Sequence, residues 1–127
     1  MQDYNYVYEG DMEITLELST IKTPQASQLQ GFWEDNVNSL VAYLEYVHKG
    51  ITGVISSAST GAIIADAEIT VQGREGFTVY SDAEFGQYFR ILLPGTYQVT
   101  AAKSGFSSQT KSVTVTGNSV VTLNFAL

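Results

Sequence analysis

The hydrophobic period of this chain changes at Gly50, and this change constrains the fold more than any other feature of the sequence. Between residues 28 and 48, apolar side chains recur at steps of three and four, as they do on one face of an α-helix. After Gly50 the apolar residues alternate with polar ones, which is typical of β-strands. The sequence therefore predicts one amphipathic helix followed by a β-rich region that continues to residue 127.

The predicted helix spans residues 28–48 and has recognisable start and stop signals. Ser27 and Gln30 have the spacing of a capping box, and Gly50 is a natural residue to end a helix. Its apolar stripe consists of Leu29, Phe32, Trp33, Val37, Leu40, Val41, Leu44 and Val47. A stripe this wide requires a large apolar surface to cover.

Seven short segments with a period of two follow the helix, and turn-forming residues such as Gly117-Asn118 separate them. This pattern indicates a seven-stranded antiparallel β-sandwich. We place the strands at 51–56, 66–72, 77–81, 87–92, 96–103, 108–115 and 119–126. The residues predicted to face inward include Ala67, Ile69 and Val71, then Tyr97, Val99 and Ala101, then Val121, Leu123 and Phe125.

One further strand is predicted before the helix, at residues 12–19. Ile14, Leu16 and Leu18 would face one way, and Glu13, Thr15 and Glu17 the other. The strand needs a sheet to join, and the helical segment that follows does not provide one.

Composition excludes several classes of function. The net charge of −7 disfavours binding to nucleic acid, because such a chain repels phosphate backbones. No apolar stretch approaches the roughly 20 residues of a membrane span. The absence of cysteine excludes disulfides, thiolate metal sites and cysteine nucleophiles. The first residues lack a basic and apolar leader, so we expect no signal peptide in this chain.

Few residues are candidates for chemistry. The single histidine, His48, ends the predicted helix and is interpreted as a helix-end cation rather than a base. A zinc site within the chain would need mainly carboxylates, which zinc sites rarely use alone. Residues 82–84 lack the spacing of a calcium loop and are interpreted as a solvated turn. The remaining candidate is the polar face of the first strand, with Glu13, Thr15 and Glu17, although outward-facing polar residues are common on strands.

Several motifs give this pattern a more specific meaning. They are Asp3-Tyr4-Asn5-Tyr6, Met12 to Leu18, Trp33-Glu34-Asp35-Asn36, Gly50-Ile51-Thr52-Gly53, Tyr88 to Ala101 and Ser104-Gly105-Phe106. Together they resemble the end of funnel-type zinc metallocarboxypeptidases of the regulatory branch, which includes carboxypeptidases D, E, M and N. The resemblance implies that 1–49 is the C-terminal remnant of an α/β catalytic domain. It implies that 50–127 is a transthyretin-like, carboxypeptidase regulatory-like β-sandwich.

The resemblance also implies roles for three residues. Glu17 matches the family's catalytic glutamate, which acts as a general base on zinc-bound water and then as an acid to the leaving amine. Gln2 matches a residue deep in the pocket for the substrate's C-terminal side chain, where glutamine accompanies a preference for Lys or Arg. Thr15 would line the same pocket. The zinc ligands of the family, an HxxE motif and a later histidine, lie upstream of the matched region. So do the arginines that hold the substrate carboxylate and the mobile tyrosine.

We therefore expect a fragment whose zinc-dependent parent hydrolyses C-terminal Lys or Arg from peptides outside the cell or in the periplasm. The chain alone is expected to be inactive and to serve as a folding, stability or interaction module. The alternative is a free-standing transthyretin-like binding module of an exported protein. A transthyretin-type hydroxyisourate hydrolase is disfavoured because its site needs several histidines and this chain has one.

Self-association is expected through helix 28–48 and strand 12–19, because the stripe has lost the large sheet it would cover.

Overall fold

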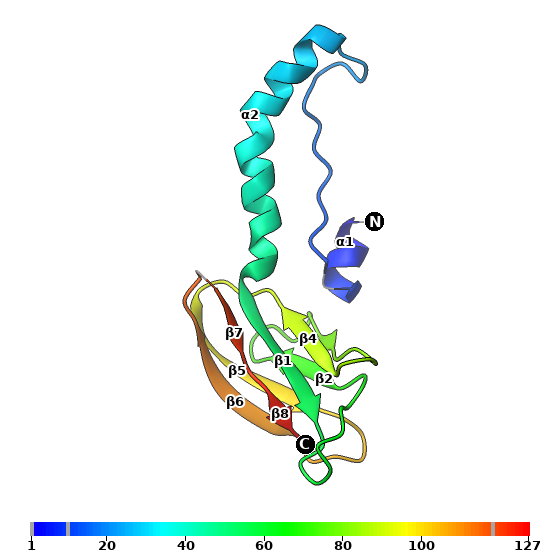
Figure 1. Ribbon diagram of the computed structural model, residues 1–127, viewed down its shortest axis with the longest axis vertical. Helices are drawn as coiled ribbons and strands as arrows, with labels where there is room; N and C mark the ends of the chain where they lie inside the picture. Colours follow the sequence, from blue (N-terminus) through cyan, green and yellow to red (C-terminus); the bar gives the residue numbers. More distant parts are fainter. Residues whose placement is uncertain (1, 10, 118) are drawn as a thin grey trace.

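Two small β-sheets form the body of the molecule, and a long helix extends away from one end of them (Figure 1). The computed structural model describes residues 2–9, 11–117 and 119–127, so the predicted turn residue Asn118 lies outside these ranges. The helical elements are α1 (Gln2–Tyr4), the π-helical turn η1 (Asn5–Glu9), α2 (Ala26–Glu45) and the 3-10 turn η2 (Tyr46–His48). The strands are β1 (Gly50–Ser56), β2 (Glu68–Val71), β3 (Val79–Tyr80), β4 (Gln87–Arg90), β5 (Gly95–Ala102), β6 (Gln109–Val115), β7 (Val120–Thr122) and β8 (Phe125–Ala126).

The two sheets have different strand directions. One has the order β3-β2-β5-β6 and is antiparallel throughout. In the other, β1 lies between β4 and β7, and β8 also pairs with β1. β1 is antiparallel to β4 but parallel to β7 and β8. The fold is mainly β, as predicted, but this second sheet is mixed rather than antiparallel.

The predicted last strand, 119–126, is divided into β7 and β8 by a side chain. Between the two strands, Asn124 Oδ1 accepts a hydrogen bond of 2.9 Å from the backbone N–H of Val54 on β1. An amide side chain thus takes the place of a main-chain acceptor, and the ladder is interrupted at that point. The alternation of apolar residues continues through the interruption, which is why the sequence indicates one strand.

The core lies between the sheets and contains the residues predicted to face inward. Ala67, Ile69, Val71, Val99 and Ala101 are completely buried, and Phe125 is 1% exposed. Tyr97, Val121 and Leu123 are partly buried and pack against this cluster. Burial of each large apolar side chain is worth about 1.5–3 kcal/mol, so this cluster is the main source of stability.

Helix α2 starts and ends slightly earlier than predicted. Its first turn is fixed by Gln25 and Gln28, since Gln28 Oε1 accepts a hydrogen bond of 3.2 Å from the N–H of Gln25. The predicted capping pair, Ser27 and Gln30, is therefore wrong, and both residues lie inside the helix. No residue of α2 is buried, and Trp33 is 53% exposed.

The prediction of a β-strand at residues 12–19 is wrong. The segment is extended but pairs with no strand, and it runs back alongside α2 (Figure 1). A helix satisfies its own backbone groups internally and offers none to a neighbouring strand, so the segment has no ladder to join. Ile14, Leu16 and Leu18 are between 42% and 47% exposed.

Candidate functional site

The residues matched to catalytic roles lie outside the β-sandwich. Glu17 and Thr15 belong to the extended segment before α2, and both are exposed. Gln2 lies in α1 and is half-buried.

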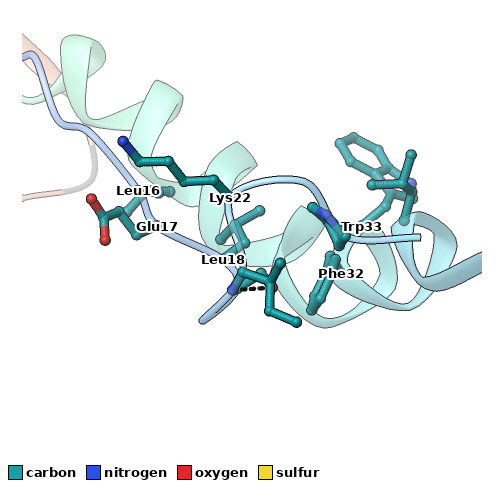
Figure 2. Close-up of a pocket in the computed structure, with 10 residues that line it drawn as sticks. Leu16, Glu17, Leu18, Lys22, Phe32 and Trp33 are labelled. Atoms are coloured by element: carbon teal, nitrogen blue, oxygen red, sulfur yellow. Dashed lines mark hydrogen bonds between the residues drawn. The ribbon is translucent and has the colours of Figure 1, made fainter. Parts of the chain in front are cut away.

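A cavity of about 440 Å³ opens between the extended segment and the first turns of α2. Its lining consists of Leu16, Glu17, Leu18, Ser19, Ile21, Lys22, Pro24, Leu29, Phe32 and Trp33. The walls are mostly apolar, and Figure 2 shows the Glu17 carboxylate pointing away from Phe32 and Trp33. The dashed line in the figure marks the bend after the segment, where Ser19 Oγ accepts a hydrogen bond of 3.2 Å from the N–H of Ile21.

Of the three predicted site residues, only Glu17 lines this cavity. Thr15 and Gln2 are not among its lining residues. A carboxylate at the rim of an apolar cavity accepts hydrogen bonds from a ligand or attracts a cation.

The described residues do not fit a zinc ion. Among residues 2–9, 11–117 and 119–127, no group of three or more His, Cys, Asp or Glu side chains is placed to hold a metal. His48 lies in η2 and is exposed. A zinc ion beside Glu17 would therefore need ligands other than the side chains of these residues.

Asp82, in the other acidic segment, holds a turn together. Its carboxylate accepts hydrogen bonds from the backbone N–H groups of Phe85 at 2.7 Å, Gln87 at 2.8 Å and Glu84 at 2.9 Å. These bonds, that from Phe85 above all, lower the pKa of Asp82 below its ordinary value. Since both oxygens are engaged by the main chain, the carboxylate fixes the turn before β4 rather than serving a ligand.

Comparison with known proteins identifies the family. Residues 50–127, which contain every strand described above, match the carboxypeptidase regulatory-like domain family. The chain belongs to this family.

The relatives of this carboxypeptidase regulatory-like domain include whole carboxypeptidases. Human carboxypeptidase D is 38% identical over 128 residues, an alignment that covers 100% of this chain and 9% of that protein. The carboxypeptidase N catalytic chain of Rattus norvegicus is 44% identical over 119 residues, covering 91% of this chain and 24% of that protein. The chain thus spans a small part of these relatives. The resemblance to a C-terminal part of a regulatory carboxypeptidase is confirmed.

One solved structure, that of Klebsiella pneumoniae 5-hydroxyisourate hydrolase, aligns with 64% of this chain and 84% of its own. The TM-score is 0.47 and the sequence identity 18%, and a likeness at this level carries no argument about function. Within the described ranges, no helix is both long and apolar enough to cross a membrane.

Proposed function

We propose that this chain is a C-terminal portion of a zinc metallocarboxypeptidase whose longer parent removes C-terminal Lys or Arg from peptides. The observation that carries the proposal is the extent of the similarity. The alignment with human carboxypeptidase D covers 100% of this chain, whereas the family match begins at residue 50. The similarity therefore includes the extended segment and α2, which a regulatory-like domain does not need.

In the parent, Glu17 is the carboxylate that transfers protons, and Gln2 and Thr15 line the pocket for the substrate's side chain. These roles rest on the resemblance alone. The zinc ion implied for the parent needs ligands from outside the described residues, since none of their clusters fits a metal. The division into 1–49 and 50–127 is part of the same proposal, as is the parent's location outside the cell or in the periplasm.

The chain alone serves as a folding, stability or interaction module. Its exposed apolar face, on α2 and the extended segment, supports this role. Ile14 and Leu16 line a cavity together with Trp33 and Leu44, so the two segments present one continuous surface. Such a surface suits coverage by the remainder of a catalytic domain.

An activity assay tests the proposal in two forms. The isolated chain with zinc should show no turnover of a peptide ending in arginine, and measurable zinc-dependent cleavage would contradict this.

In a longer gene product that is active, Glu17→Gln should lower kcat by about 10²–10⁴-fold, the usual contribution of a general base. Glu45→Gln is the matched control, because Glu45 is an exposed glutamate at the end of α2. Equal activity of the two variants would contradict the role of Glu17.

The second candidate is a free-standing binding module of an exported protein. It is favoured by the family match, which is confined to residues 50–127. The DNA upstream of the coding sequence distinguishes the carboxypeptidase portion from the free-standing module. An in-frame HxxE motif upstream supports the carboxypeptidase, and a separate promoter with its own start codon supports the module.

A further inference from the structure

Arg90 is a buried cation at the end of β4. Alternate residues of this strand face the interior, so Arg90 follows Tyr88 into the space between the sheets. Only 7% of Arg90 is exposed. Its guanidinium carbon lies 5.5 Å from the centre of the Phe77 ring, which is cation–π distance.

Among residues 2–8, 11–117 and 119–127, no anion is paired with this charge. Their one ion pair joins Lys103 and Asp66, and none of their hydrogen bonds uses the guanidinium of Arg90. Its Nε is fully buried and finds no hydrogen-bond partner within the described part of the chain. Burial lowers the pKa of Arg90, and the positive charge of Arg74 acts in the same direction, whereas the interaction with Tyr6 raises it. Buried charges and buried N–H donors in proteins are nearly always paired, so this one requires an explanation.

The guanidinium lines a small pocket that contains both arginines of the chain. The cavity has a volume of about 250 Å³. Arg74 lines it from the loop after β2, and its guanidinium carbon lies 5.8 Å from the centre of the Tyr97 ring. Phe77, Leu92 and Leu93 supply apolar walls, and Tyr6 from the N-terminal segment lies edge-on to Phe77 at 5.3 Å. In a chain of net charge −7, this is a local concentration of positive charge.

We propose that this pocket binds a carboxylate, held by the Nε and one terminal nitrogen of Arg90, with Arg74 as a second positive charge. The guanidinium fork matches the two oxygens of a carboxylate, and such paired bonds are stronger than neutral ones. The apolar walls suit the short aliphatic group attached to that carboxylate. The carboxylate is either that of a small free acid or the side chain of a glutamate on an adjoining protein segment.

Arginine NMR provides a direct readout, because the chain has two arginines and therefore two Nε–Hε signals. Sodium acetate and N-acetylglutamic acid amide are titrated separately into the full chain, against sodium chloride at equal ionic strength. The Arg90 signal should shift saturably with millimolar affinity and exchange more slowly with water. Tighter binding of the glutamate derivative identifies a protein-borne side chain, and equal binding identifies a free acid. Equal shifts in acetate and chloride, or binding of inorganic phosphate but not of carboxylates, would overturn the proposal.

Two variants separate binding from folding. Arg74→Gln changes an exposed residue and should weaken acetate binding about two- to fivefold, the scale of one solvent-screened charge interaction. Arg90→Met removes an unpaired buried charge, so its melting temperature should equal or exceed that of the wild type in chloride. Acetate should raise the melting temperature of the wild type and leave that of Arg90→Met unchanged. An equal acetate effect on both proteins would contradict the assignment to Arg90.

Discussion

The hydroxyl of Tyr88 donates a hydrogen bond of 2.6 Å to the backbone carbonyl of Leu123, and this bond crosses over strand β1. Tyr88 is on β4, on one side of β1, whereas Leu123 lies between β7 and β8 on the other side. Gly53 is paired with Tyr88 and leaves the space through which the side chain reaches. The bond therefore ties the C-terminal segment to β4.

Replacing Tyr88 with phenylalanine removes this bond and keeps the ring in the core. The free energy of unfolding should fall by about 0.5–1.5 kcal/mol, because the partly buried Leu123 carbonyl loses its hydrogen-bond partner. Urea denaturation measures the change. Tyr80→Phe is the matched control, since Tyr80 is 57% exposed, and its effect should be close to zero. Equal effects would show that the Tyr88 hydroxyl contributes nothing to stability.

Gly53→Ala should destabilise the sandwich more than any exposed glycine substitution. A Cβ at this position would lie 2.1 Å from the Leu123 carbonyl oxygen and 3.0 Å from the Tyr88 ring. Both strands would have to shift, at a cost of at least about 1–3 kcal/mol. Gly31→Ala is the control, because nothing lies within 4 Å of it in α2. It should stabilise the helix by about 0.5–1 kcal/mol, so the two changes should have opposite signs in thermal unfolding.

The turn held by Asp82 should make stability depend on pH. The pKa of Asp82 is lower in the folded chain than its ordinary value, chiefly because its carboxylate accepts a hydrogen bond from the N–H of Phe85. Its hydrogen bonds therefore contribute fully above the unfolded pKa of about 3.9, and this contribution is lost as the pH falls through the lower folded pKa. Unfolding measured at a series of pH values should show stability falling in this acidic range.

Asp82→Asn should remove this part of the pH dependence and should lower stability at neutral pH. Glu84→Gln is the control, because the Glu84 carboxylate is exposed and accepts none of the hydrogen bonds of the described residues. An unchanged pH profile in Asp82→Asn would assign the acid sensitivity to other carboxylates.

The apolar face on α2 should drive self-association of the isolated chain. Trp33 and Leu44 are 53% and 67% exposed, and burying them against a second copy is favourable by about 1.5–3 kcal/mol each. Light scattering should show a mass that rises with concentration. The double change Trp33→Glu and Leu44→Glu should give a monomer, whereas Asn38→Glu, at an exposed polar position of the same helix, should not. A wild-type chain that stays strictly monomeric at high concentration would contradict the prediction.

Some features of the fold were predictable from the sequence because they depend on neighbours along the chain. Apolar period distinguishes helix from strand, and it correctly gave the inward positions Ala67, Ile69 and Val71. The same local signal failed for residues 12–19. The alternation of apolar and polar residues describes only where side chains point. A β-strand also needs a neighbouring strand with unpaired backbone N–H and C=O groups, and the backbone groups of α2 are bonded within the helix.

The sequence by itself determined the helix, the β-rich region and the residues of its core, and its motifs pointed to the carboxypeptidase relatives. The tertiary structure alone decided which strands pair and in which direction. The Asn124 side chain that divides β7 from β8 meets Val54 only after folding. Likewise, Arg74 and Arg90 share a pocket because the loop after β2 and the end of β4 come together across the sandwich. Such contacts join residues distant in the chain, and a local pattern carries no information about them.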